Sequence, residues 1–398
     1  MKAGWEIKTL GEVLAVLRNG VNCKQSKNGE GDKISRIESI SDAKFNLEKV
    51  GFSELNEAEK SRYLLKKGDI LFSHINSAIH VGKTAIFDSD ELVYHGVNLL
   101  LMRPNGDVMP DYLEHSLKYL FQCGYWRGEC KQSVNQASVN QQDIVKVKIS
   151  YPKSLTEQKR LVTLLDEAFE SIATAKANAQ QNLKNARALF ESHLNEVFTK
   201  RGEGWETKTL GEICILKSGT TVNANLEKTS GDLPYLKVAD MNYAGNEIEI
   251  VSSSRFLNKS DIGRNAIIPS GTTIFPKRGG AILTNKKRLT TVPICADLNI
   301  MGVIPSDALL SKYLYFYFIN VDMRQLGSGS SIPQINNYDI EPLTISFPES
   351  KSQQEKIICE LENLSEETQR LEALYSRKIA ALDELKKALL HRAFSGEL

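Results

Sequence analysis

GWEIKTLGE at residues 4–12 returns as GWETKTLGE at residues 204–212, with eight of nine residues identical. Further along, VNQQDI at 139–144 matches INNYDI at 335–340, and Tyr151-Pro152 matches Phe347-Pro348, now at an offset of 196. The second copy is therefore four residues shorter (200 − 196) between its tryptophan and its proline. Self-similarity over this length predicts two copies of one structural unit.

Each copy ends in a segment that predicts a long helix. Residues from about 157 to 198 and from about 353 to 394 contain no Gly or Pro, and apolar residues recur at steps of three and four. A start signal precedes each segment, Ser154 with Glu157 and Ser352 with Glu355, which is typical of a capping box. At about 1.5 Å per residue, each helix is a rod of roughly 60 Å.

The two predicted helices offer each other an apolar stripe. Small residues such as Ala168 and Ala175 on the first helix match larger ones on the second, which favours close coiled-coil packing. The alternative is that each helix lies on its own globule, but a globule of about 150 residues is too short to cover such a rod. The expected packing positions are Leu161, Leu165, Ile172, Leu183, Leu361, Leu371, Ile379 and Leu385.

The repeat predicts the domain organisation. We expect a first globular domain at 1–153, a central long helix at 154–199, a second globular domain at 200–349 and a C-terminal long helix at 350–398. If the termini lie side by side, the chain has a pseudo-circular arrangement with approximate two-fold symmetry. The fold class is then mixed α/β, with two similar strand-rich globules separated by two antiparallel helices that form a coiled-coil spacer.

The globular parts alternate short strands with turns. Strands are expected at 69–73, 84–87 and 271–275, and shorter helices at 111–121 and 307–318. We expect Asp111 and Glu114 to form a capping box at the first of these helices.

Composition excludes several protein classes. The 398 residues carry a formal net charge of +1, with 41% hydrophobic and 25% charged residues, which is typical of a globular protein rather than a disordered or collagen-like one. The six cysteines never form C-x-x-C and no apolar signal stretch follows Met1, so we expect reduced thiols and a cytoplasmic location. No apolar run is long enough to span a membrane.

Motifs for catalysis are incomplete. Gly82-Lys83-Thr84 resembles the end of a P-loop, but Ser77 replaces the glycine that the loop requires. Asp111, Glu129 and Lys131 have the spacing of a metal-dependent nuclease, yet Gln325 stands where the second copy needs the glutamate. A zinc site from His74, His80, His95, Cys123 and Cys130 lacks the usual ligand spacing. We expect no catalytic residue, no metal site and no cofactor in this chain.

A strongly basic stretch lies in the second globule. Residues 251–300 hold eight Lys and Arg against two acids, whereas residues 51–100 of the first globule have five against seven. Lys and Arg side chains bind the phosphate oxygens of nucleic acids, and polar side chains beside glycine can form hydrogen bonds with base edges. We therefore expect double-stranded DNA as a partner. The candidates are Ser73, His74, Asn76, Lys83, Lys131, Gln132, Asn135, Lys277, Arg278, Lys286, Lys287, Arg288, Ser328 and Ser330. The alternative for each is an ordinary solvated surface.

Taken in order, these motifs resemble the specificity subunit of type I restriction-modification systems over the whole chain. They are the duplicated opening, LKKGDIL at 65–71, Pro152 with EQK at 157–159, Pro348 with QQEK at 353–356, and the closing FSGEL at 394–398.

The resemblance implies two target-recognition domains, each binding one half of a bipartite asymmetric DNA site. It also implies two modification subunits that carry S-adenosylmethionine and methylate adenine, and restriction subunits that use ATP and magnesium. Half-sites one turn apart are roughly 34 Å centre to centre, which a rod of this length can span. The alternative functions are a coiled-coil scaffold that joins two protein partners without reading DNA, and a self-sufficient nuclease.

Overall fold

The computed structural model describes residues 4–27, 29–41, 44–133, 136–200, 202–327 and 332–398. The chain forms two compact units. The first unit contains Met1–Gln180 together with Arg377–Leu398, and the second contains Gln181–Ser376. Both long helices, α6 (Leu155–Thr199) and α10 (Lys351–Ser395), contribute one part to each unit. Each unit therefore combines one globule with a segment of both helices.

The globule of the first unit begins with a strand and a one-turn helix. Its strands are β1 (Trp5–Thr9), β2 (Leu14–Asn19), β3 (Asp32–Ile34), β4 (Gly51–Ser53), β5 (Asp69–Phe72), β6 (Ile75–Asn76), β7 (Thr84–Phe87), β8 (Val93–Tyr94), β9 (Leu100–Pro104), β10 (Lys131–Ser133), β11 (Gln136–Ser138) and β12 (Lys148–Pro152). Its helices are α1 (Leu10–Val13), α2 (Glu57–Tyr63), α3 (Pro110–Gln122), α4 (Tyr125–Glu129) and α5 (Gln141–Ile144), with 3₁₀ turns at Ile37–Ile40 and Leu47–Lys49.

An antiparallel sheet in the order β2-β9-β5-β7 forms the centre of this globule. One core cluster contains Ile70, Met102 and Leu113, and a separate one contains Leu71 and Leu101. Because neighbouring strand residues belong to different clusters, the sheet is buried on both faces. The smaller sheets are β4-β3-β8, β10-β11-β6 and the pair β1-β12.

The second unit repeats this plan with its own strands and helices. Its strands are β13 (Trp205–Thr209), β14 (Cys214–Ser218), β15 (Leu233–Leu236), β16 (Glu249–Ile250), β17 (Phe256–Leu257), β18 (Ile267–Ile268), β19 (Thr273–Pro276), β20 (Arg288–Thr290), β21 (Ile294–Ala296), β22 (Ile300–Pro305) and β23 (Thr344–Pro348). Its helices are α7 (Leu210–Ile213), α8 (Ser311–Asn320) and α9 (Asn337–Ile340), with 3₁₀ turns at Ala224–Leu226, Val238–Asn242, Lys259–Asp261, Arg264–Ala266, Gly279–Thr284 and Met323–Gln325.

The sheets of the second unit match those of the first. Its main sheet has the order β14-β22-β19-β20-β16, in which β14-β22-β19-β20 corresponds to β2-β9-β5-β7. A second sheet has the order β17-β15-β21-β18, and β13 pairs with β23 as β1 pairs with β12. The register is also kept, since Trp5 lies opposite Pro152 and Trp205 lies opposite Pro348. The predicted mixed α/β fold with an internal repeat is confirmed.

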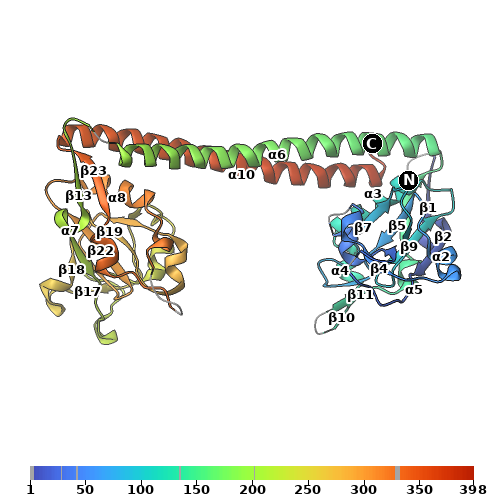
Figure 1. Ribbon diagram of the computed structural model, residues 1–398, viewed down its shortest axis with the longest axis horizontal. Helices are drawn as coiled ribbons and strands as arrows, with labels where there is room; N and C mark the ends of the chain where they lie inside the picture. The colour runs from blue at the N-terminus through green and yellow to red at the C-terminus, as the bar shows by residue number, and fades with distance from the viewer. Residues whose placement is uncertain (1–3, 28, 42–43, 134–135, 201, 328–331) are drawn as a thin grey trace. The chain divides into compact units, whose positions relative to one another are not determined.

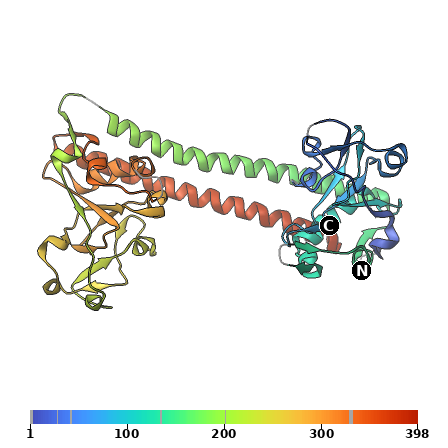
Figure 2. The same cartoon turned by 60° about the horizontal axis from the view of Figure 1, so that its bottom comes forward.

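Within each unit the two long helices run side by side in opposite directions (Figures 1 and 2). In the first unit Lys176 Nζ lies 2.6 Å from Asp383 Oδ1, and in the second Arg187 Nε lies 2.7 Å from Glu372 Oε1. A later residue on α6 thus pairs with an earlier residue on α10, which is the antiparallel order that the sequence predicts.

The ends of both helices are anchored in the globules by equivalent residues. In the first unit Leu161 and Leu165 of α6 share a core cluster with Leu390 and Phe394 of α10. In the second unit the two helices exchange places in the equivalent cluster. Ile358 and Leu361 from the start of α10 lie there with Leu194 and Phe198 from the end of α6. Phe394 packs edge-on against Tyr112, and Phe198 packs in the same way against Tyr313, both at 5.3 Å between ring centroids.

The C-terminus lies in the first unit together with the N-terminal strand (Figure 1). Leu398 is partly buried against the core cluster that contains Trp5. The transition from α6 to β13 in the second unit is thus matched in the first unit by the end of α10 beside β1. This is the pseudo-circular arrangement expected from the repeat.

Of the predicted helix-packing residues, Leu161, Leu165, Ile172 and Leu361 are buried, and Leu183, Leu371 and Ile379 are half-buried. Leu385 differs from the expectation because 47% of its surface is exposed. Its counterpart on α6, Leu189, is 63% exposed. Both leucines therefore lie outside the buried seam between the helices, although their sequence spacing fits it.

Two helix starts also differ from the predictions. The backbone carbonyl of Ser350 accepts from the N–H of Gln354, so α10 begins one residue before the predicted Ser352 cap. Ser154 does sit before α6, where its hydroxyl accepts from the N–H of Glu157 at 3.4 Å. At α3 the cap position is Met109, and Glu114 pairs with Lys118 instead of forming a capping box.

A buried glutamine ties each long helix to its globule. The side chain of Gln158, fully buried, accepts from the N–H of Met109 at 2.8 Å and donates to the carbonyls of Asp107 and Pro152. Gln354, equally buried, makes the same three bonds with Leu310, Ala308 and Pro348. Since Pro152 and Pro348 are buried, the amide satisfies carbonyls that would otherwise be unpaired there.

Over the residues that the structure describes, no helix combines the length and the apolar character that crossing a membrane would require.

Candidate nucleic-acid interface

The segment after β5 is joined to the polar segment at 131–138 by a small sheet in the first unit. In it β6 pairs with β11, with Asn76 opposite Ala137, and β11 pairs with β10, with Ser138 opposite Lys131. The N–H of Val139 also donates to the carbonyl of His74 at 3.0 Å. Two stretches that the sequence singled out separately thus lie next to each other. This sheet lies at the end of the globule that is remote from α6 and α10 (Figure 1).

The second unit has the same junction. The N–H of Ile335 donates to the carbonyl of Lys277 at 2.9 Å, and the N–H of Gly279 donates to the carbonyl of Pro333 at 2.8 Å. Arg278 forms an isolated β-bridge with Gln334 between them. In the first unit the segment after β5 therefore contacts the segment before α5. In the second unit the segment after β19 contacts the segment before α9 in the same way.

In each unit a polar residue at the end of the first strand of the main sheet accepts a hydrogen bond from the junction. These residues are Asn19 of β2 and Ser218 of β14. In the first unit Gln141 donates to Asn19 Oδ1 at 3.2 Å, and in the second Lys277 Nζ donates to Ser218 Oγ at 2.7 Å. We call these surfaces the polar ends. The polar end of the first unit comprises Asn19, Asn76, Lys131 and Gln141, and that of the second comprises Ser218, Lys277, Arg278 and Gln334.

The candidates in the first unit divide into buried and accessible ones. Ser73 and His74 are buried, 1% and 7% exposed, and burial lowers the pKa of His74. They support the junction from inside, so the prediction that they face DNA is wrong. Asn76 is half-buried and Lys131 exposed. Lys83 is half-buried and donates to the carbonyl of Ser41 at 3.2 Å.

Several candidates are not covered by the structure. The side chain of Gln132 and the whole of Asn135 lie outside the described residues, as do Ser328 and Ser330. The backbone of Gln132 belongs to β10, opposite Ala137. These four residues remain predictions.

In the second unit the candidates Lys277 and Arg278 lie at the polar end. That they contact DNA stays a prediction. Arg278 is exposed, and in the part of the chain that is described no acidic side chain pairs with it. Lys277 is half-buried, and its burial together with the neighbouring Arg278 charge lowers its pKa. Two adjacent cations without an acidic partner are suited to a phosphate.

Three other candidates from the basic stretch serve the protein's own structure. Lys287 is only 3% exposed, and its ammonium donates to Asn285 Oδ1 at 2.8 Å and to the carbonyl of Val321 at 2.7 Å. Arg288 donates to the carbonyls of Lys287 and Met241, and Lys286 donates to Asn242 Oδ1. Lys287 cannot reach a DNA groove, which corrects the sequence prediction for this residue.

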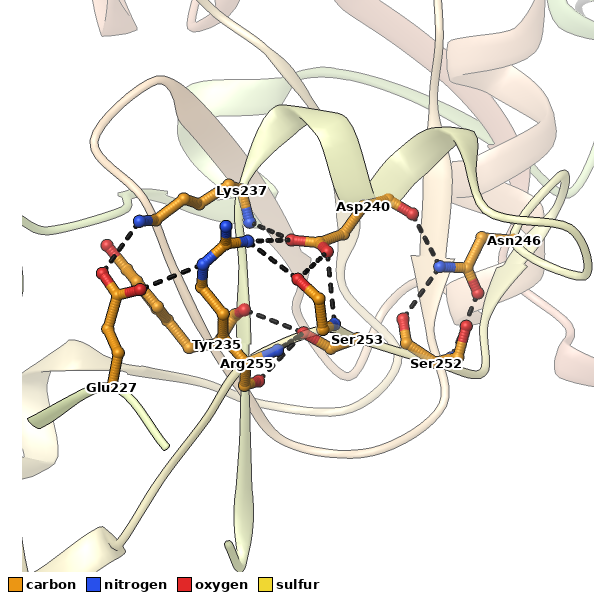
Figure 3. A network of polar contacts seen from close by, with 9 residues as sticks. Glu227, Tyr235, Lys237, Asp240, Asn246, Ser252, Ser253 and Arg255 are labelled. Atoms are coloured by element: carbon orange, nitrogen blue, oxygen red, sulfur yellow. Dashed lines mark hydrogen bonds and ion pairs between the residues drawn. The ribbon is translucent and has the colours of Figure 1, made fainter. Parts of the chain in front are cut away.

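Another arginine of the basic stretch is neutralised by a network of acids. Figure 3 shows Glu227 between Lys237 and Arg255, at 2.8 Å and 3.0 Å respectively. The buried Asp240 accepts from the hydroxyl of Ser254 at 2.8 Å and from the N–H of Lys237 at 2.7 Å. Because Arg255 already has an acidic partner outside residues 251–300, the excess of eight Lys and Arg over two acids in that stretch overstates the accessible positive surface.

Each junction also presents an exposed isoleucine, which the sequence analysis did not identify. Ile75 in the first unit is 37% exposed, and Ile332 in the second, next to Pro333, is 69% exposed. Apolar side chains beside amides suit a groove that contains thymine methyl groups. Asn19, Gln141, Ser218 and Gln334 were missed as well. The adjacent match of VNQQDI with INNYDI was a signal for Gln141.

The residues considered for catalysis do not form a metal site in the described part of the chain. No group of three or more His, Cys, Asp or Glu side chains there has a geometry that holds a metal ion. Asp111 lies in the first turn of α3, and Glu129 is the last residue of α4.

Comparison with known proteins shows that both copies of the repeat match the same family domain. The type I restriction modification DNA specificity domain matches residues 2–185 and again residues 202–379. A protein named as the type I restriction enzyme MjaX specificity subunit of Methanocaldococcus jannaschii is 28% identical over 372 residues, which cover 88% of this chain and 84% of that protein.

Solved structures share the fold over the whole chain. One comes from work on complex assembly and conformational transition of the type I R-M system. It has a TM-score of 0.76 and 18% identity, and the match covers 100% of this chain and 99% of that one. The HsdS subunit from Thermoanaerobacter tengcongensis has a TM-score of 0.61 and 18% identity, with 100% and 98% covered. With two matched domains spanning most of its length, the chain belongs to the type I restriction-modification DNA specificity family.

Proposed function

We propose that each polar end contacts one half of a bipartite, asymmetric DNA site. The family membership gives the chain a DNA sequence-specificity role with two target-recognition domains. The observation that supports the polar ends as the reading surfaces is their recurrence. The same backbone junction is built twice, but its side chains differ, with Asn76 and Lys131 in one unit and Lys277 and Arg278 in the other. A shared scaffold with different side chains is what two different half-sites require.

The chemistry of these side chains supports a division of roles. Lys131, Lys277 and Arg278 are suited to phosphate oxygens, which position a protein on the duplex. Asn76, Gln141 and Gln334 offer both donors and acceptors, which a base edge in the major groove can satisfy. Ile75 and Ile332 add apolar surface. We infer that the second unit relies more on phosphate contacts than the first.

We further infer that the chain positions two adenine methyltransferase subunits, and restriction subunits where the system has them. S-adenosylmethionine, ATP and magnesium then belong to those partners. The two-fold repeat supports two equivalent docking surfaces, one for each copy. All six cysteines are free thiols, which fits a cytoplasmic location.

A coiled-coil scaffold that joins proteins without reading DNA is the competing function. The test is a gel shift of the full chain assembled with its methyltransferase, on a site-containing duplex and on one with a scrambled site. We expect the specific duplex to be retained at a salt concentration that releases the scrambled one. Equal retention of both duplexes, or none of either, would favour the scaffold.

A further inference from the structure

The two ion pairs between the long helices are equivalent to each other under the internal repeat. At the repeat offset of 196, Lys176 of α6 corresponds to Glu372 of α10, and in the same way Arg187 corresponds to Asp383. Lys176 Nζ lies 2.6 Å from Asp383 Oδ1 in the first unit. Arg187 Nε lies 2.7 Å from Glu372 Oε1 in the second. The repeat therefore converts one ion pair into the other, with the two helices exchanged.

The charges at these equivalent positions are opposite on the two helices. Both residues on α6 are cations and both residues on α10 are acids. If each helix carried one cation and one acid instead, every combination of the two helices would form ion pairs in this register. With the sequence as it is, only α6 together with α10 forms them. Charges at facing helix positions are a common means by which coiled coils select their partners.

The same register shows what a pairing of like helices would do. If α6 packed against the α6 of a second copy, Lys176 would face Arg187. If α10 packed against a second α10, Glu372 would face Asp383. Facing like charges destabilise a helix pair, whereas each observed ion pair stabilises it slightly. The four side chains are between 31% and 58% exposed, so each contact is weak alone and the selection comes from exchanging two attractions for two repulsions.

The sizes of the side chains between the helices follow the same asymmetry. Ala179 and Ala186 of α6 are 1% and 7% exposed. Their equivalents on α10 are Tyr375 and Leu382, which are much larger and half-buried. Two α6 helices would bring alanines together and leave the space between them underfilled, and two α10 helices would overfill it. Side-chain size therefore opposes the same two pairings that the charges oppose.

The apolar clusters at the helix ends do not distinguish the two helices. Leu194 of α6 corresponds to Leu390 of α10, and Phe198 corresponds to Phe394. A second α6 therefore has the same apolar side chains with which α10 completes the cluster of the first unit. Pairing of like halves is thus compatible with the globules, and residues along the helices must prevent it.

From these contacts we propose that the four charged residues of the two ion pairs select the partner of each long helix. They direct α6 to α10, within one chain or between halves from different copies, and they exclude a symmetric pair of like halves. One consequence rests on the proposed function: every assembled pair then has two different globules and reads an asymmetric site. A pair of like halves would read the same half-site twice.

The test uses the full chain with a protease site inserted after Gly202, between α6 and β13. Cleavage after purification leaves both halves in the folded protein, which is then unfolded in denaturant, refolded without DNA and analysed by native mass spectrometry. If all pairings had equal affinity, mixed pairs would make up about half of the total. We expect mixed pairs to exceed like pairs at least about tenfold, with a smaller excess at high salt because the ion pairs are partly exposed. A random mixture overturns the proposal.

Arg187→Glu combined with Glu372→Arg separates charge from side-chain size. The double variant keeps an opposite pair at this contact in reverse order, so the intact chain should melt like the wild type. Each helix then carries one cation and one acid, and all three pairings form ion pairs. We expect the excess of mixed pairs to fall at least about fivefold. An unchanged excess overturns the proposal, because it would assign the selection to side-chain size alone.

The matched control reverses an ion pair that lies within one helix. Glu367 and Arg370 of α10 are exposed and pair with each other at 2.6 Å. Glu367→Arg combined with Arg370→Glu keeps the net charge of α10 and should leave the excess of mixed pairs unchanged. A fall as large as in the first double variant would mean that the selection does not depend on the contacts between the helices.

A second measurement does not depend on refolding. The whole chain is produced in one cell as two halves, with the first half carrying either of two tags, and complexes are purified through one tag. In the wild type we expect the second half to be recovered without the other tag, and in the Arg187→Glu and Glu372→Arg variant we expect both tags together. Both tags together in the wild type would contradict the proposal. Because neither measurement involves DNA, its failure is distinguishable from a failure of the proposed function in the gel shift.

Discussion

The N–H of Met109, just before α3, donates to the buried side-chain oxygen of Gln158 in the first turn of α6 at 2.8 Å. This bond joins the shared helix to the globule, and Gln354 with Leu310 repeats it at 2.9 Å in the second unit. Each long helix is therefore joined to its globule by buried glutamine hydrogen bonds in addition to the apolar cluster.

The first prediction concerns the hydrogen bonds of the buried glutamine. Gln354→Leu leaves the N–H of Leu310 and the carbonyls of Ala308 and Pro348 without partners, so it should lower the free energy of unfolding by about 2–4 kcal/mol. Denaturant unfolding measures the loss, and hydrogen exchange shows whether it is confined to the second unit. Gln353→Leu changes the adjacent, exposed side chain and should cost almost nothing. Equal losses in both variants would mean that the three bonds contribute little.

The antiparallel register of α6 and α10 predicts a charge-reversal result. Arg187→Glu places two acids at the contact with Glu372, and Glu372→Arg added to it restores an opposite pair in reverse order. Because Arg187 is more than half exposed, the coupling energy should be modest, about 0.3–1 kcal/mol. A double-mutant cycle at low salt measures it. A coupling of zero would show that the pair is not formed in solution.

Arg278→Ala should weaken DNA binding by the assembled complex and make it less sensitive to salt. Removing one phosphate contact lowers the slope of log K against log salt by about 0.9 for duplex DNA. Lys286→Ala is the matched control because that lysine also belongs to the basic stretch but already bonds Asn242. An unchanged salt slope in Arg278→Ala would remove this residue from the interface.

The buried Lys287 predicts a pH effect on stability rather than on DNA binding. Desolvation lowers its pKa to about 8 in the folded chain, while the unfolded value is near 10.5. Between these two values the unfolded state binds more protons, so this residue makes stability rise with pH from about 8 to 10.5. The contribution is up to about 3 kcal/mol, and Lys287→Met should remove it. Unfolding of both chains at pH 7.5 and 10 tests this; identical pH dependence would contradict it.

The long helices and the repeat could be predicted because their signals are periodic. Forty residues without Gly or Pro and with an apolar stripe leave few alternatives to a helix. Leu385 shows the limit of that pattern. It follows the three-four spacing, yet it points out of the seam, since a 3.6-residue period drifts around a straight helix.

The polar ends could be predicted only in part. Asn76 and Lys131 were each noticed, but their placement in one small sheet, on either side of β11, depends on a β6 strand of two residues, which has no periodicity to detect. Lys287 and Arg278 look alike in sequence. Lys287 is buried because its ammonium donates to the carbonyl of Val321, 34 residues away, and to the side chain of Asn285. The left-handed backbone of Asn285 brings that side chain to the ammonium. Long-range contacts of this kind decide which cation faces solvent.

The most direct test of two independent reading units is an exchange of the second globule. Residues 205–346 are replaced by those of another family member, and methylated adenines are mapped genome-wide in cells that contain the partner methyltransferase. The two-unit account predicts that one half of the methylated sequence changes and the other half stays the same. An unchanged sequence, or a change in both halves, would contradict it.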